Sequence, residues 1–271
     1  MNENRIGFLC CVALFFIGFL LNGQMGLYFN FSGLLIVLGG TAGAALLSYR
    51  MERLKIVWKV LRSSYCCQHK RPEELVEILV DLSVKSKFQG LLSLQKDEKQ
   101  STMLFMRQGL GLLVDGYSGK AIREILDTEM YFFKMRRDDC ERVVRSIAAL
   151  LPPFGLVGSV VGLIAMLGGV DDPSKILQSV PIALTSTLYG VVFANFFFLP
   201  FAGNLREYTS HELLNKKIIL EGLLAIESDM DPRSLEKKLK SFLTPSARQG
   251  RLVSLQRIQE RFHIKPIQES V

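Results

Sequence analysis

The sequence predicts an all-α integral membrane protein with four transmembrane helices, a large helical cytoplasmic loop and a cytoplasmic C-terminal tail. Two late segments, Ser146–Leu167 and Pro181–Phe201, contain no charged residue and are long enough to cross a hydrocarbon core of roughly 30 Å at about 1.5 Å per residue. Two further apolar segments, Ile6–Leu21 and Phe31–Leu47, lie near the N-terminus. No alternating strand pattern persists in the 271 residues, which indicates an all-helical fold.

The first apolar segment, Ile6–Leu21, is short for a span and could extend into Asn22–Met25. A cleaved signal peptide is the alternative, because a short apolar segment near the N-terminus is typical of one. Only one cation, Arg5, precedes the segment, and no clear small-x-small cleavage site follows it. We therefore interpret Ile6–Leu21 as the first of four spans.

Positive charge is concentrated in two long segments. Residues 48–145 hold 19 of the 33 Lys and Arg residues and residues 204–271 hold 12, whereas the short connections 22–30 and 168–180 contain only Lys175. Because Lys and Arg are enriched in cytoplasmic segments, both long segments and both termini are predicted to be cytoplasmic. This bias and attraction to anionic lipid explain the net charge of +7, so no nucleic-acid partner is expected.

The segment after the second span begins with a predicted basic amphipathic helix, Met51–Cys66. Its apolar residues Leu54, Val57, Trp58 and Leu61 fall on one side, and its lysines lie elsewhere. A helix of this type directly after a span typically lies on the membrane surface.

Further helices are expected along both cytoplasmic segments. Pro72 opens one that runs to about Lys87, with Gly90 as its breaker. Asp231 and Pro232 are typical of a helix start. This last helix is expected to end at Phe242. In the first cytoplasmic segment we also expect a helix over Thr102–Leu113, a turn over Asp115–Gly119, and a long helix over Ala121–Arg145 that continues into the third span. After the fourth span we expect helix through Ile226 and a loosely ordered or locally helical tail over 244–271.

The third span combines prolines with a line of small residues. Gly155, Ser159 and Gly162 share one helix face, and Gly158 forms a GxxxG motif with Gly162. Small residues let helices approach closely in lipid, which would explain the pattern by packing alone. Pro152 and the proline after it release backbone carbonyls in the preceding turn, which favours a hinge or a polar backbone position.

The fourth span carries a similar set of hydroxyl and small residues. Hydroxyls in a span can simply donate to their own helix, so this pattern does not by itself require a polar path. The alternative is that Ser159 and Thr187 face a hydrated path and contact a cation or a protonatable group. The residues of this set are Thr185, Ser186, Thr187, Gly190, Ala194 and Pro200, of which Thr187, Gly190 and Ala194 line one face.

None of the four predicted spans contains Asp, Glu, Lys, Arg or His. A membrane ion pathway normally requires an ionisable group, so a carboxylate would have to come from another polypeptide. The sequence also contains no phosphate-binding loop, nucleophile elbow or Cys/His dyad. We therefore expect no enzymatic activity, no cofactor and no metal site.

At these residues the chain resembles the MotA/PomA family of flagellar motor stator A subunits. The resemblance extends from the second span to about residue 243, and the combination of motifs is specific although each motif alone is short. The matching residues are Leu35–Gly40, Leu112–Gly116, Pro152–Ser159, Gly162, Leu163, Asp171–Pro173, Ile182–Leu184, Thr187–Gly190, Asn195, Pro200 and Gly222–Ile226.

The resemblance implies a pentamer in the bacterial inner membrane around two copies of a B-type subunit, which has an intramembrane Asp and a peptidoglycan-binding domain. Flow of the transported ion, H+ or Na+, would rotate the pentamer, and the cytoplasmic loop would push the rotor protein FliG. The implied division is transmembrane helices 1 and 2 in residues 1–48, a rotor-contacting domain in 49–145, transmembrane helices 3 and 4 in 146–203, and cytoplasmic helices with a basic tail in 204–271.

By position, the resemblance implies a role in conformational coupling for Pro152 and Pro200 and a role in ion passage for Ser159 and Thr187. Thr185 and Ser186, next to Thr187, are further candidates for the ion path. Close packing is expected of Gly155, Gly158, Gly162, Gly190 and Ala194. Serine at position 159 is compatible with either ion, so both remain open, with protons favoured.

The rotor-contacting loop departs from the family pattern. Lys87 matches the basic contact position, but Gln95 and Lys96 stand where Glu is common. The expected contact residues are therefore Lys85, Lys87, Asp97 and Glu98, with ordinary solvated charge as the alternative.

Two other functions stay open on the sequence. One is an ExbB/TolQ-like energiser of envelope transport, a class that usually has three spans with one before the large loop. The other is a passive membrane scaffold or receptor, which predicts no ion flux and leaves the hydroxyl residues unexplained.

Overall fold

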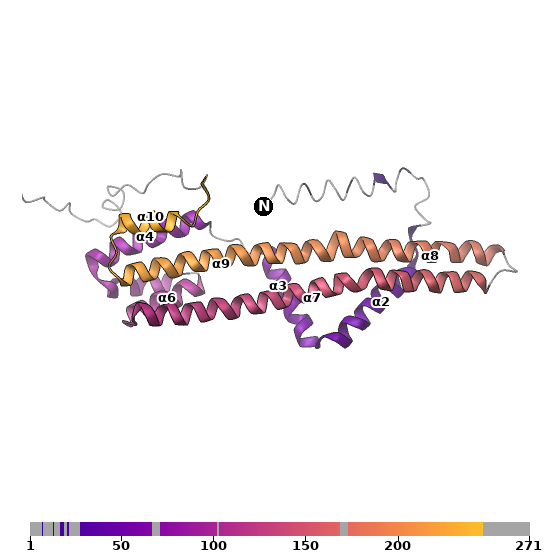
Figure 1. Cartoon of the computed structure of the whole chain (residues 1–271), viewed down its shortest axis with the longest axis horizontal. Helices are drawn as coiled ribbons and strands as arrows, with labels where there is room; N and C mark the ends of the chain where they lie inside the picture. The colour runs from indigo at the N-terminus through magenta and orange to yellow at the C-terminus, as the bar shows by residue number, and fades with distance from the viewer. Residues whose placement is uncertain are drawn as a thin grey trace, which may run out of the picture. The chain divides into compact units, whose positions relative to one another are not determined.

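The computed structural model describes residues 28–66, 71–101, 103–168 and 173–245, together with isolated positions at 7, 13, 17, 18 and 21. These residues form helices and no strand, as the sequence predicts (Figure 1). Most of the first predicted span, Asp171 and Asp172 of the outer loop, and the tail beyond residue 245 lie outside the described residues.

The chain divides into two compact units, which we treat separately. The first comprises the described parts of residues 1–66 and 137–206, and the second those of residues 67–136 and 207–271. Two long helices, α7 (Gly119–Leu167) and α9 (Leu199–Glu227), contribute residues to both units.

Three helices in the described part of the chain are long and apolar enough to cross a membrane: Phe31–Ser48, Gly119–Leu167 and the continuous helical run Ala183–Glu227. They include the second and third predicted spans and the fourth from Ala183 onward. As expected, α7 is a single helix of 49 residues that passes through both Pro152 and Pro153.

In the first unit, α2 (Phe31–Ser48) packs against α8 (Pro173–Val192). Asn30 caps α2, because its Oδ1 accepts a hydrogen bond from the N–H of Gly33 at 3.2 Å. Val37 of α2 is buried in one apolar cluster with Leu151 and Ala194. The small and apolar residues of α2 thus position the third and fourth predicted spans.

The helix α3 has the predicted bounds, Met51–Cys66. Val57 is buried, and Leu54 and Leu61 pack beside it against Val143 and Ala202. These three residues share one side of the helix, as predicted, and the structure packs that side against other helices of the unit. Trp58 differs, because its side chain is 72% exposed.

The fourth predicted span contains a π-helical segment, η3 (Phe193–Phe198), between α8 and α9. At its end, the N–H of Leu199 donates to the carbonyl of Ala194, five residues earlier. Pro200 follows directly and has no N–H to donate to the carbonyl four residues before it. A wider turn before Pro200 lets the helix continue, which the sequence analysis did not anticipate.

In the second unit, α4 (Pro72–Gln89) ends as predicted at Gly90, whose φ of 77° lies in the left-handed region that glycine tolerates. The segments η2 (Leu91–Leu94) and α5 (Gln95–Gln100) were not predicted, because the polar run over 95–100 has no apolar period. The helix α6 spans Leu104–Val114. These elements share an apolar core with α7, α9 and α10 (Pro232–Lys240), built from Leu79, Leu110, Leu126, Leu223 and Leu239 among others.

The predicted cap of α10 is confirmed, since the side chain of Asp231 accepts the N–H of Arg233 at 3.1 Å. The helix ends at Lys240 rather than at Phe242. The Asp115–Gly119 turn is also present, with Gly116 at φ 78°, although Gly119 already begins α7.

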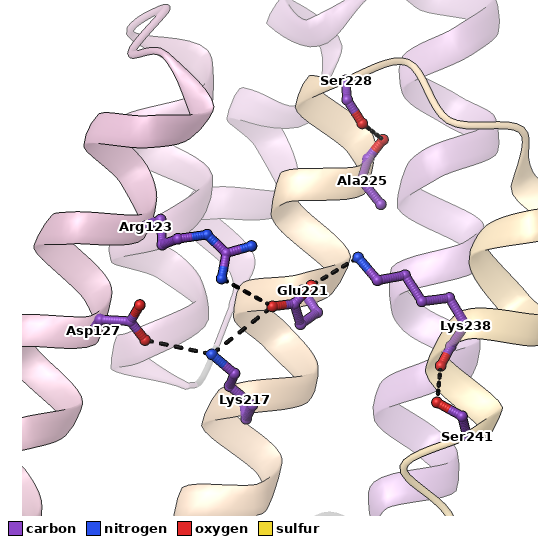
Figure 2. Close-up of polar contacts among 8 residues, drawn as sticks. All are labelled: Arg123, Asp127, Lys217, Glu221, Ala225, Ser228, Lys238 and Ser241. Atoms are coloured by element: carbon purple, nitrogen blue, oxygen red, sulfur yellow. Dashed lines mark hydrogen bonds and ion pairs between the residues drawn. The ribbon is translucent and has the colours of Figure 1, made fainter.

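A buried carboxylate, Glu221 of α9, joins three helices of the second unit (Figure 2). Its Oε2 lies 2.7 Å from Nζ of Lys238 in α10, and its Oε1 lies 3.2 Å from Nη1 of Arg123 in α7. Lys217, which also pairs with Asp127, lies 3.8 Å from Oε1. Burial alone would raise the pKa of Glu221, but the hydrogen bond and charge of Lys238, together with Arg123, lower the pKa below its usual value.

Replacing this carboxylate by an amide, Glu221→Gln, is expected to destabilise the second unit by about 2–3 kcal/mol at pH 7, because charge-assisted hydrogen bonds are lost. The pKa of Glu221 is lower in the folded state than in the unfolded state. The carboxylate therefore stabilises the folded state fully above its unfolded-state pKa, and this stabilisation is lost as the pH falls through its folded-state pKa. Thermal unfolding of the detergent-solubilised full chain at pH 7 and at lower pH measures both effects.

The matched control is Glu207→Gln, at a side chain that is 66% exposed and 3.9 Å from His211. This variant should unfold like the parent chain, because exposed pairs contribute little. Equal effects of the two substitutions would contradict the role given to Glu221.

Candidate functional site

The contact between α7 and α8 is made through glycine. A Cβ atom placed on Gly190 of α8 would lie 2.6 Å from the carbonyl oxygen of Leu151 and 3.2 Å from the Cα atoms of Gly155 and Pro152. One placed on Gly162 would lie 2.6 Å from the backbone nitrogen of Ala183. The two backbones therefore approach as closely as small residues permit.

Two hydroxyls meet within this contact. Oγ of Ser159 and Oγ1 of Thr187 are 2.5 Å apart, and Ser159 also donates to the carbonyl oxygen of Ala183. Oγ1 of Thr187 lies 3.5 Å from the carbonyl oxygen of Gly155. When the single proton of Ser159 is donated to Ala183, the proton between the two hydroxyls has to come from Thr187.

This arrangement gathers four oxygen atoms in a region whose predicted spans contain no Asp, Glu, Lys, Arg or His. Both hydroxyl residues are half-buried rather than enclosed. Oxygen atoms of this kind can coordinate a small cation or accept a proton from a hydronium ion. We name the set formed by Ser159, Thr187 and the carbonyls of Ala183 and Gly155 the oxygen cluster.

The neighbouring hydroxyl residues differ from this pair. Thr185 donates at 2.6 Å to the carbonyl of Pro181 in its own helix and is 5% exposed. Ser186 is fully buried, and Gly158 is packed against its side chain. Of the predicted hydroxyl residues, the structure therefore brings Ser159 and Thr187 together and leaves Thr185 and Ser186 in the helix packing.

The remaining predicted residues lie around the same contact or farther along the helix. Pro152 lies beside Gly190. Ala194 is buried against Val37 and Leu151, and Pro200 follows the π-helical segment.

One polar connection was missed in the sequence analysis. The hydroxyl of Tyr189 in α8 donates to the carbonyl of Tyr28 and accepts the N–H of Asn30 at 2.8 Å. It thereby ties the start of α2 to α8. Asn30 directly before an apolar segment is typical of a helix N-cap, but nothing in the sequence indicated that Tyr189 would be its partner.

The predicted rotor-contact residues all lie in the second unit. Nζ of Lys85 and Oδ2 of Asp97 form an ion pair at 2.5 Å, which links α4 to α5. Lys87 is exposed, and Glu98 is half-buried with its carboxyl group near Gly111. Two of the four charges therefore neutralise one another.

Comparison with known proteins decides the family. A family model described as the MotA/TolQ/ExbB proton channel family matches residues 97–218. The chain is 30% identical to chemotaxis protein PomA of Vibrio alginolyticus over 243 residues, which cover 90% of this chain and 95% of that protein. This chain belongs to the MotA/PomA family.

Other members support the same assignment. Motility protein A of Treponema phagedenis is 32% identical over 240 residues, covering 89% of this chain and 93% of that protein. The structure matches the flagellar MotAB stator complex from Bacillus subtilis with a TM-score of 0.83 at 25% identity, covering 90% of this chain and 96% of that one. As a MotA/PomA-family member, the chain is a membrane protein and an ion-driven, torque-generating stator subunit of the bacterial flagellar motor.

Proposed function

We propose that this chain and a B-type subunit form a complex in which protons, or alternatively sodium ions, pass beside the oxygen cluster. The observation that carries this proposal is the pairing of Ser159 and Thr187 across a glycine contact, within predicted spans that contain no Asp, Glu, Lys, Arg or His. Such a site can accept an ion or a proton for a moment, but it has no charged group of its own that would retain it.

The topology proposed for this function has four spans with both termini in the cytoplasm of a bacterial cell, in its inner membrane. It rests on the 19 and 12 cationic residues of segments 48–145 and 204–271. Segment Ile6–Leu21 is the proposed first span.

The B-type partner would contribute an intramembrane Asp. A buried carboxylate is costly to desolvate, so neutralising it with the transported ion changes how its helix packs against α7 and α8. The transmembrane potential supplies about 2.3 kcal/mol per charge per 100 mV for each transfer. Pro152, beside Gly190, is placed to transmit this change along α7, because its ring removes one backbone hydrogen bond of the helix.

Repetition of this step at successive copies in a pentamer around two B-type subunits would produce rotation. The second unit would then push the rotor protein FliG. Among the four proposed contact residues, Lys87 is the exposed one, whereas Lys85 and Asp97 pair with each other and hold α5 against α4.

Motility in a stator-deletion host tests the proposal. The chain is expressed with its adjacent B-type gene, and swimming speed is measured while sodium is varied at fixed proton-motive force. Motility that is independent of sodium and abolished by a protonophore identifies a proton motor, and speed that rises with sodium identifies a sodium motor. A stable membrane complex without motility would overturn the proposal and favour an envelope energiser of the ExbB/TolQ type, which the matched family model also includes.

Pro152→Leu is expected to leave the complex assembled and to abolish swimming, because the released carbonyl of the preceding turn regains its donor and α7 stiffens. Complex yield and swimming are measured in the same host. Pro153→Leu is the matched control, because it restores a donor for the carbonyl of the exposed residue Ala149, whereas Pro152→Leu restores one for the carbonyl of Ala148, which is 2% exposed. Normal swimming of Pro152→Leu would exclude the coupling role.

A further inference from the structure

The helix α3 presents an exposed stripe that mixes apolar and cationic side chains. Met51, Lys55, Trp58, Lys59 and Arg62 follow one another at the spacing of a single helix face, and all five are exposed. Trp58 is 72% and Met51 56% exposed. We call these five residues the α3 stripe.

A neighbouring face of α3 is buried and fixes the direction of this stripe, about a quarter of a turn round the helix. Val57 is 5% exposed and packs with Leu54 and Leu61 against residues of α7 and α9 from the same unit. Arg53, beside that face, pairs with Asp139 at 3.4 Å. The inner residues of α3 therefore pack against other helices of the unit. Among the described residues, none of the three cations of the stripe forms an ion pair.

The position of α3 along the chain places the stripe near the end of a span. Two residues, Tyr49 and Arg50, separate the end of α2 from Met51. Two residues reach at most about 7 Å. Because α2 is a candidate membrane span, α3 has to begin at the boundary between hydrocarbon and water.

We propose that the α3 stripe binds the anionic phospholipid surface of the cytoplasmic leaflet. Trp58 and Met51 would enter the boundary between headgroups and acyl chains, where amphipathic aromatic rings are enriched. Lys55, Lys59 and Arg62 would reach lipid phosphates, with their aliphatic stems along the apolar boundary. The one acidic residue of α3, Glu52, lies at the edge of the stripe.

A lipid surface fits this stripe better than an acidic protein does. An exposed tryptophan and methionine between cations would cost free energy against a hydrated acidic surface but gain it in the interface. This inference rests on the proposed topology, in which α2 spans the membrane and α3 lies on the cytoplasmic side, and does not depend on ion conduction or on FliG.

The chain contains a single tryptophan, so its fluorescence reports Trp58 alone. The full-length chain is reconstituted in nanodiscs of neutral phosphatidylcholine, with or without phosphatidylglycerol. We expect lipids brominated near the headgroup to quench Trp58, and we expect aqueous acrylamide to quench it weakly. Adding phosphatidylglycerol at low salt should reduce acrylamide quenching further, by about twofold, and high salt should reverse that change.

Two sets of variants separate lipid binding from other causes. Lys55→Gln/Lys59→Gln/Arg62→Gln should lose the dependence on phosphatidylglycerol and salt. The control variant Lys120→Gln/Lys134→Gln/Lys237→Gln removes the same charge from exposed positions of the second unit. Its acrylamide quenching should still depend on phosphatidylglycerol and salt. Trp58→Phe/Phe88→Trp moves the probe to an exposed position in α4 and should be quenched by acrylamide.

Three results would overturn the proposal. Strong acrylamide quenching with no effect of brominated lipid would place the stripe in water. Shielding from both quenchers would mean that protein, such as a second copy of this chain, covers it. An equal loss of phosphatidylglycerol dependence in both triple variants would show a net-charge effect rather than a site.

Discussion

Gly190→Ala is expected to reduce swimming at least tenfold, although it adds only one methyl group. The added Cβ would lie 2.6 Å from the carbonyl oxygen of Leu151 and 3.2 Å from two Cα atoms of α7. These are backbone atoms, so no side chain can rotate away, and α8 has to move. Overpacking of this kind costs about 1–3 kcal/mol.

Displacement of α8 would also separate Thr187 from Ser159, whose hydroxyl oxygens are now 2.5 Å apart. The substitution should therefore impair ion conduction even where the complex still assembles. Swimming speed, ion flux into cells expressing both subunits, and the yield of the solubilised complex measure the three consequences separately.

Gly203→Ala is the matched control. It lies in α9, five residues after the end of the π-helical segment, and a Cβ there meets no atom within 4 Å. Both substitutions gain the same helix propensity, about 1 kcal/mol, so the difference between them isolates the steric effect. If Gly190→Ala swims as well as Gly203→Ala, the close helix contact has no functional role.

Thr187→Val is the second substitution with a large expected effect. Valine has nearly the shape of threonine but removes the hydroxyl that pairs with Ser159 and faces the carbonyl of Gly155. A hydrogen bond to a charged group contributes about 1.5–3 kcal/mol, so loss of this oxygen from the ion path predicts a reduction in flux of about 10- to 100-fold. The flux of the wild-type complex, with its B-type subunit, is the reference.

Thr185→Val provides the control, two residues away. The hydroxyl of Thr185 is bonded at 2.6 Å to the carbonyl of Pro181 in its own helix and does not belong to the oxygen cluster. This variant should retain most of the flux, and Thr187→Ser should restore what Thr187→Val loses. Equal losses in Thr185→Val and Thr187→Val would indicate a general packing defect rather than an ion path.

The sequence by itself determined the helical class and most of the helix boundaries. Pro72 and Gly90 predicted α4, Asp231 predicted the start of α10, and Met51–Cys66 predicted α3 to the residue. These signals are local, because caps, breakers and apolar periodicity act within one or two turns. The resemblance on Pro152–Ser159 and Thr187–Gly190 likewise identified the family that the relatives establish.

The polar segment Gln95–Gln100 shows where local signals failed. It has no apolar face to mark it as a helix, and the ion pair between Asp97 and Lys85 connects it to α4. The π-helical turn before Pro200 was not predicted for a similar reason. Proline by itself predicts an interruption of the helix, but not the backbone geometry that lets the helix continue.

Only the tertiary structure decided which hydroxyls form the oxygen cluster. The resemblance singled out Ser159 and Thr187, but the sequence does not show that Thr187, rather than Thr185 or Ser186, meets Ser159, which lies 24 or more residues away from the partners it contacts. A rotation of about 100° per residue turns adjacent side chains to different faces, so the rotation of α8 against α7 selects one of the three. Gly155, Gly162 and Gly190 permit that rotation, because a Cβ at any of them would press against the backbone of the other helix.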